Sequence, residues 1–152
     1  MKYNIEYQAA EAVKGYLTAT LDAADFTSWP IVTWFDPMAI DDASRVVCIC
    51  QSATSHETGA GNFSADVEVG VRTNWNQPTV QADMASHFDR VAQVRDVLND
   101  DTDALVAGIA AQCAAGFTVS YVNVRREYAT EVNEGNYYSS VKLSIECHAT
   151  EE

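Results

Sequence analysis

Apolar residues recur at helical spacing in three segments of the chain. In residues 5–21 they follow the pattern i, i+4, i+8, i+11, i+12 and i+16, at Ile5, Ala9, Val13, Tyr16, Leu17 and Leu21. In residues 79–99 they form one stripe that we expect to face the core: Met84, Phe88, Val91, Val94 and Leu98. Residues 102–113 follow an Asp-rich stretch that can cap a helix, and they carry Leu105 and Ile109 one turn apart. The spacing predicts three amphipathic helices.

Other segments alternate apolar and polar residues, as half-buried strands do. Ser64–Thr73 places Val67, Val69 and Val71 on one face. Two longer runs, Phe117–Tyr128 and Tyr137–His148, are separated by the polar link Ala129–Asn136. They predict a hairpin about 40 Å long, with a tip that overhangs the domain.

The segments between the first helix and the central strand are shorter. Arg45–Gln51 reads as a buried strand, and Ile31–Phe35, between Pro30 and Pro37, as an edge strand or an extended arm. The Ser, Thr and Gly content of Ser52–Phe63 predicts an exposed, mobile loop.

Together these segments predict an α+β fold in one domain, residues 1–152. We expect a mostly antiparallel sheet of four or five strands with helices 5–21, 79–99 and 102–113 packed on it, and a long C-terminal hairpin. An apolar fraction of 47% excludes wholesale disorder. A parallel sheet, or helix at residues 66–73, would contradict this prediction.

The net charge of the chain excludes some classes of binding partner. The chain has 22 acidic and 9 basic residues, a net charge of −13. Such a surface lacks a patch that neutralises phosphates, so we expect no tight or sequence-specific binding to DNA or RNA. The acidity favours either solubility alone or a surface that lies near DNA without adhering to it. No apolar run reaches the ~20 residues that cross a bilayer, and Met1–Tyr7 lacks a signal-peptide core, so we expect a soluble protein made in the cytoplasm, with no membrane partner.

Residue spacing argues against a metal or cofactor site. Cys48 and Cys50 lie two apart on a strand and share a face, whereas Cys147 and His148 are neighbours that face opposite ways. A composite metal site of these four residues is the alternative to free buried thiols, which we favour. The aspartate clusters at residues 41–42 and 100–103 lack the spacing of a calcium loop. We expect His87, beside the apolar stripe of its helix, to be a boundary residue.

The sequence also lacks a convincing catalytic motif. Ser55, His56 and Glu57 contain the residue types of a hydrolase, but adjacent loop residues cannot align as nucleophile, base and orienting acid. Gly-x-Ser-x-Gly, Walker and dinucleotide motifs are absent. We therefore expect no enzyme, no catalytic residues and no cofactor. The alternative is a small acidic enzyme or ligand-binding domain that uses the 52–63 loop.

Two segments are candidates for protein contacts. Residues 29–38 are unusually apolar for a loop, which favours either a lid over the core or a docking patch for a neighbouring subunit. The hairpin adds an adjacent arginine pair, suited to ion pairs between subunits, and an acidic tip at residues 130–136. The predicted interface residues are Trp29, Trp34, Phe35, Met38, Arg125, Arg126, Glu131, Glu134 and Tyr137.

The order of elements resembles that of the tail-terminator, or tail-completion, proteins of long-tailed bacteriophages and of related neck proteins. The resemblance spans roughly residues 5–148. It rests on the first helix at Ala12–Leu21, the strand SADVEVGVRT, the helix at Met84–Leu98 and the hairpin that ends in VKLSIECHAT.

The resemblance implies a structural virion protein that forms a ring, commonly hexameric, at the head–tail neck or at the top of the tail tube. The implied partners are further copies of the chain, an adjacent neck or connector protein and the tail tube protein, with DNA passing through an acidic channel. A bacterial adaptor protein of similar fold is a third hypothesis, and the mass of the protein in solution separates it from a ring.

Overall fold

The computed structural model describes residues 4–33, 44–56, 61–75, 77–99, 102–133 and 135–150, without the side chains of Gln77, Thr102, Arg126, Glu127 and Asn133. The helices are α1 (Ile5–Thr20), α2 (Val80–Leu98), which follows the short 3-10 helix η1 (Gln77–Thr79), and α3 (Thr102–Ala110). The strands are β1 (Ile31–Thr33), β2 (Arg45–Ser55), β3 (Asn62–Asn74), β4 (Phe117–Asn133) and β5 (Asn136–Ala149).

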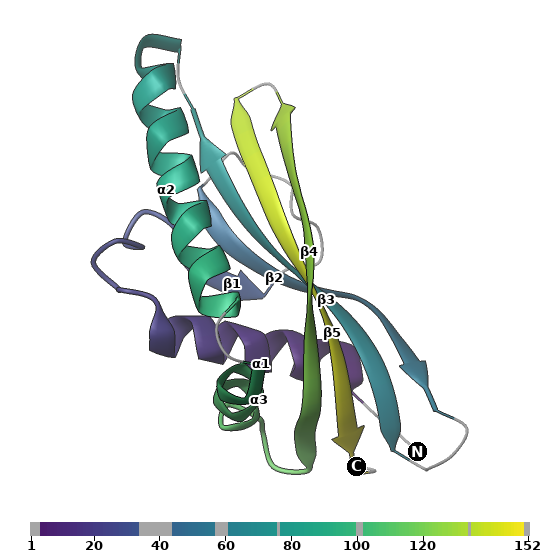
Figure 1. The fold of residues 1–152 in the computed structure, drawn as a ribbon. Helices are drawn as coiled ribbons and strands as arrows, with labels where there is room; N and C mark the ends of the chain where they lie inside the picture. Colours follow the sequence, from purple (N-terminus) through teal and green to yellow (C-terminus); the bar gives the residue numbers. More distant parts are fainter. Residues whose placement is uncertain are drawn as a thin grey trace.

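The strands form one twisted sheet in the order β1-β2-β3-β5-β4, covered on one face by the helices (Figure 1). β1 pairs with β2 in parallel, and every other neighbouring pair is antiparallel. The fold is therefore α+β with a mostly antiparallel sheet of five strands, three helices and a C-terminal hairpin, as the sequence predicted.

The core lies between the helices and the sheet. Val67, Val69 and Val71 point from β3 into one cluster of buried residues, which also takes in Leu17 of α1 and Leu98 of α2. The alternation of β3 forces Asp66, Glu68 and Arg72 onto the opposite, helix-free face. Because α1 packs on β1, β2 and β3, α2 on β3 and β5, and α3 on β4, each strand has a helical partner.

Two polar segments predicted as connections are largely strand, so those predictions were wrong. Ser52–Ser55 extends β2 and pairs with Phe63–Asp66, leaving residues 56–61 to connect the strands. Residues 129–133 likewise extend β4 and pair with β5. Pairing satisfies the backbone of Ser, Thr and Asn residues as well as that of apolar ones, so polarity alone did not mark the strand ends.

The buried face of α2 also differs from the predicted one. Its buried residues are His87, Val91, Val94 and Leu98, whereas Met84 and Phe88 are each 43% exposed. His87 is fully buried rather than a boundary residue, because its ring nitrogens meet two hydroxyl groups of the sheet. Nδ1 lies 2.7 Å from Thr73 Oγ1, and Nε2 lies 2.8 Å from Ser139 Oγ.

Candidate subunit-contact surface

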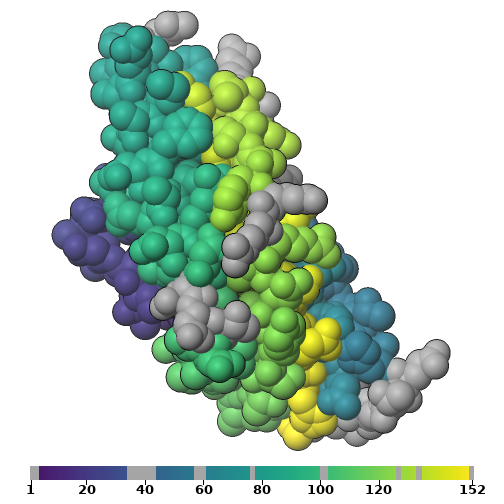
Figure 2. All heavy atoms as spheres, viewed as in Figure 1, coloured from purple at the N-terminus to yellow at the C-terminus, as the bar shows by residue number. Residues whose placement is uncertain are grey.

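β4 is the outermost strand of the sheet and is only partly covered. It is 17 residues long, and its far edge has no strand neighbour among the described residues. α3 packs on β4, whereas α2 packs on β3 and β5. The C-terminal half of β4 therefore lies beside α2 and not beneath it. Figure 2 shows the two as adjacent surfaces in the upper part of the view.

Four large apolar side chains are exposed in this region. Met84 and Phe88 of α2 are 43% exposed, Tyr128 of β4 is 47% exposed and Val132 is 64% exposed. We name these four residues the α2–β4 apolar surface. Grouped, solvent-exposed apolar side chains mark sites of protein contact more often than single ones do.

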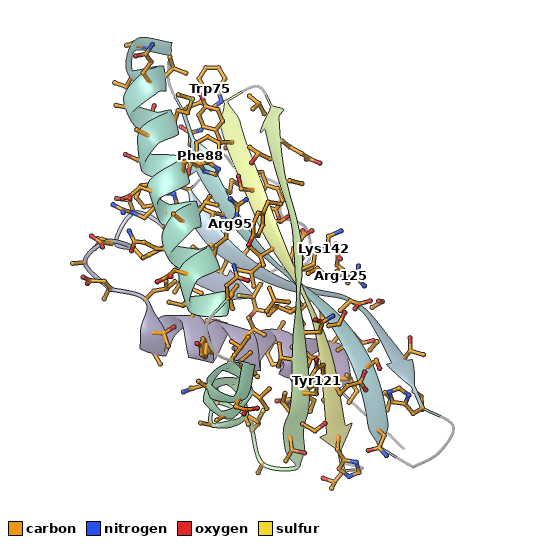
Figure 3. All side chains as sticks on the ribbon, viewed as in Figure 1. Trp75, Phe88, Arg95, Tyr121, Arg125 and Lys142 are labelled. Carbon is orange, nitrogen blue, oxygen red and sulfur yellow. The ribbon has the colours of Figure 1, made fainter. Side chains whose placement is uncertain are left out.

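The two parts of this surface face each other across the seam between α2 and β4. Met84, Phe88 and Arg95 lie on one side of α2, since they are four and seven positions apart. The Arg95 guanidinium lies 4.0 Å from the centre of the Tyr128 ring, and Asn99 Nδ2 donates to Tyr128 Oη at 2.8 Å. Figure 3 shows Phe88 and Arg95 on the side of α2 that is turned toward the hairpin.

A buried chain of polar groups fixes the floor beneath this surface. Trp29 Nε1 donates to Thr73 Oγ1 at 2.9 Å, and Thr73 in turn contacts His87. On the other side of His87, Ser139 Oγ lies 2.8 Å from Thr130 Oγ1 of β4. These polar contacts thus connect β3, α2, β5 and β4 beneath the α2–β4 apolar surface.

Charge is distributed unequally between the two layers of the protein. In the helices and the connection after α1, acidic side chains outnumber basic ones: Glu6, Glu11, Asp22, Asp25, Asp83, Asp89, Asp96 and Asp103 against Lys14, Arg90 and Arg95. On the helix-free face of the sheet the signs balance: Asp66, Glu68, Glu131 and Glu146 against Arg45, Arg72, Arg125 and Lys142. Figure 3 shows Arg125 and Lys142 near each other on the sheet, and Arg125 Nη2 lies 3.7 Å from Asp66 Oδ1.

The predicted interface residues fall into three groups. Trp34, Phe35, Met38 and Glu134, and the side chain of Arg126, lie outside the described part of the structure. Arg125 and Glu131 are exposed on the hairpin, as a contact residue requires.

Trp29 and Tyr137 have partners within the protomer. Trp29 is half-buried against the core, with the Arg90 guanidinium 5.1 Å from its ring centre. Tyr137 is buried between Trp75 and His87, with ring centres 6.1 Å and 5.5 Å away. We therefore leave these two residues out of the contact surface considered below.

Sequence reasoning assigned Met84 and Phe88 to the core and did not single out Tyr128 or Val132. The signal was present, because α2 carries two overlapping stripes at helical spacing that share Val91, Val94 and Leu98. Because His87 belongs to the buried stripe, Met84 and Phe88 lie at the surface.

The structure also shows what surrounds His56. Its Nε2 lies 2.8 Å from both Glu146 Oε2 and Ser64 Oγ, and Ser64 Oγ donates to Glu146 Oε1 at 2.7 Å. In a catalytic triad the serine and the acid bind opposite nitrogens of the imidazole. Here both bind the same nitrogen and the serine proton points to the carboxylate, so the cluster joins the β2–β3 hairpin to β5. Among the described residues the side chain of Ser55 makes no hydrogen bond to this cluster, and Glu57 lies outside them.

The three strand cysteines lie on the face that the alternation predicted, and His148 on the opposite face is exposed. All four cysteines are free thiols, but only Cys48 and Cys147 are buried, whereas Cys50 and Cys113 are half-buried. Burial raises the pKa of Cys48 and of Cys147 to about 12, so both are protonated at neutral pH. Within the described ranges no three His, Cys, Asp or Glu side chains are grouped to hold a metal ion, and no helix is long and apolar enough to cross a membrane.

No protein-family model matches the chain, and no curated protein is significantly similar to it in sequence.

Proposed function

We propose that this chain is a structural virion protein of a tailed bacteriophage that assembles into a ring at the head–tail neck or at the top of the tail tube. One observation carries the proposal: the α2–β4 apolar surface lies at one side of the protomer, along an edge strand whose far side has no strand neighbour in the described part of the chain. The order of elements also supports it, because it resembles that of tail-terminator and neck proteins.

The position of the surface favours assembly of like subunits. If this side edge contacts a different surface of the next copy, the contact is heterologous, and heterologous contacts generate a ring where the rotation between neighbours closes. The partners of the ring would be an adjacent neck or connector protein and the tail tube protein.

The distribution of charge suggests how the ring is oriented. A channel that passes DNA benefits from a surface that repels phosphates and does not bind them. The helix layer carries the excess of acidic side chains, so we propose that it faces the channel. The balanced helix-free face would then lie on the outside of the ring.

A labelling experiment tests the virion role separately from assembly. Antibodies against the purified protein are applied to tailed particles released from the cells that encode it. We expect electron microscopy to show label at the junction of head and tail. Label that is absent from particles, or confined to the capsid shell, would contradict the proposed location.

A further inference from the structure

The strands pair regularly in the centre of the sheet and irregularly toward its sides. β3 and β5 pair without a shift of register along the whole of β3. The pairing of β4 with β5 shifts twice, and that of β2 with β3 shifts once, between Cys50 and Ser52. Both β4 and the part of β2 beyond Cys48 have a side that no described strand covers. The irregular pairings therefore lie on the strands with an open edge.

The larger irregularity in β4 is a bulge of two extra residues. Arg125 lies opposite Lys142 and Ala129 lies opposite Ser140, so the backbone of residues 126–128 faces a single residue of β5. Two extra residues leave the alternation of faces unchanged on both sides of the bulge. The bulge thus interrupts the pairing of β4 without turning the strand over.

A second bulge in β4 adds one residue, Ser120. The two bulges divide the 17 residues of β4 into three regularly paired runs, Phe117–Val119, Tyr121–Arg125 and Ala129–Asn133, none longer than five residues. A strand that joins a sheet needs a regular row of N–H and C=O groups along the edge that it meets. The open edge of β4 offers such a row only in short pieces.

Contacts with α2 hold the larger bulge in place. Tyr128 is its last residue, with the Arg95 guanidinium 4.0 Å from the ring centre and Asn99 Nδ2 donating to Tyr128 Oη at 2.8 Å. The sequence at the bulge also suits an open edge, because residues 125–127 are three consecutive charged residues, Arg-Arg-Glu. Charged residues and bulges are two features that keep natural edge strands from pairing with other chains.

We propose that the two bulges prevent the open edge of β4 from pairing with a strand of another copy, so that copies join through the side chains of the α2–β4 apolar surface. This proposal rests on the ring assembly proposed above and names the way in which its contact surface is used. Pairing between edge strands can continue from copy to copy without end. A contact between fixed side-chain surfaces instead sets one rotation between neighbours, as a closed ring requires.

Deletion of Arg126 and Glu127 tests the proposal. It would place Tyr128 opposite Val141 and leave every other pair of residues as it is, so the longest regular run would have eleven residues, the five of each flanking run and Tyr128 between them. The net charge stays at −13, because one basic and one acidic residue are removed. We expect elongated assemblies in electron microscopy, with a mean mass by light scattering that rises with concentration beyond that of the parent.

The matched control is the double substitution Arg126→Ser and Glu127→Ser, which also keeps the net charge but retains the length of the bulge. We expect it to assemble as the parent does. Elongated assemblies of this control, equal to those of the deletion variant, would show that the charged side chains and not the bulge protect the edge, and would overturn the proposal.

Deletion of Ser120 is a second, independent test, because it removes the smaller bulge and joins the first two regular runs of β4. Circular dichroism and a cooperative thermal transition show whether each variant is folded. We expect the folded Ser120 deletion to elongate as well. Folded deletion variants that keep the discrete mass of the parent would overturn the proposal. A parent that stays monomeric while the deletion variants elongate would overturn the ring and leave the protection of the edge standing.

Discussion

His87 is the central residue of the buried polar groups that lie beneath the α2–β4 apolar surface. It has no exposed surface, and both ring nitrogens lie within hydrogen-bond distance of hydroxyl groups. Burial, with a smaller contribution from the charge of Arg95, lowers the pKa of His87 to about 4. The imidazole is therefore neutral in the folded protein at neutral pH, although an unfolded chain takes up a proton near pH 6.5.

This difference in pKa predicts how stability depends on pH. Between pH 6.5 and about 4 the unfolded state binds one more proton at His87 than the folded state, so the free energy of unfolding falls as the pH is lowered through this window. The loss from this residue approaches about 3 kcal/mol and is absent above pH 6.5. Urea unfolding of the parent and of His87→Gln at pH 7.5, 6 and 5 measures it. Parallel pH profiles of the two proteins would contradict the assignment.

Gly70 and Tyr138 form a second residue-level contact, on the helix-free face. The Tyr138 ring occupies the space that a Cβ at Gly70 would need, and Tyr138 Oη donates to Glu68 Oε2 at 2.7 Å. The glycine is therefore required by the close approach of a ring and not by its backbone angles.

The substitution Gly70→Ala should displace the Tyr138 ring and break its hydrogen bond to the buried Glu68. We expect a loss of about 2–4 kcal/mol in the free energy of unfolding. In the background of Tyr138→Ala the same substitution should cost much less, because the ring is no longer there. A double-mutant cycle by urea unfolding checks this, and additive effects would show that the contact is not what constrains Gly70.

At the scale of elements, α2 is rotated relative to the predicted stripe, and the rotation creates the contact surface. Met84 and Phe88 leave the core, while Val91 and Val94 stay 2% and 1% exposed. One face of α2 thus packs within the protomer, and the other is the face that we propose makes contact between protomers.

This division predicts that substitutions on the two faces have opposite effects. Phe88→Lys and Met84→Lys should change the free energy of unfolding by about 1 kcal/mol or less and should abolish assembly. Val94→Lys buries a charge and should destabilise the fold by more than about 3 kcal/mol. Thermal unfolding and light scattering measure the two properties. If Phe88→Lys assembled like the parent, this face would not be the interface.

The sequence predicted the buried face of an element where apolar periodicity determines that face. It did not predict the buried face where a single polar contact determines it. Val67, Val69 and Val71 fixed the faces of β3, and the apolar spacing of α1 fixed its buried side. The register of α2 depends instead on the meeting of His87 with Thr73 and Ser139, which are distant in sequence and not encoded in the helix itself. The far ends of β2 and β4 were missed because cross-strand pairing, not apolar content, makes them strands.

The candidate site was predictable only in part. The sequence identified the hairpin, and Arg125 and Glu131 are exposed on it. The predicted overhang of the hairpin was wrong, because β5 pairs with β3 as far as Asn136 opposite Asn74.

The choice of Tyr137 as an interface residue was wrong, since Tyr137 packs inward against Trp75. The signal was present, because Tyr137 is an even number of positions from Val141 and Leu143 and therefore shares their buried face.

At the scale of the whole molecule, the net charge of −13 opposes the association of identical chains. Apolar contacts must overcome this repulsion, which salt screens. The Debye length falls from about 30 Å at 10 mM salt to about 8 Å at 150 mM. We therefore expect assembly to strengthen several-fold over this range.

Sedimentation in sodium chloride measures this dependence. Chloride is used in place of sulfate, because sulfate itself strengthens apolar burial. Assembly that weakens steadily as chloride rises would show that ion pairs, and not apolar contacts, dominate the interface.

The mass of the purified parent in solution, followed over concentration by multi-angle light scattering, tests the central claim most directly. The account predicts one discrete assembly of the 16.6 kDa chain, about 100 kDa if six copies close the ring. Electron microscopy of the same sample should then show rings with a central opening. A monodisperse species of 16.6 kDa at every concentration would contradict the account.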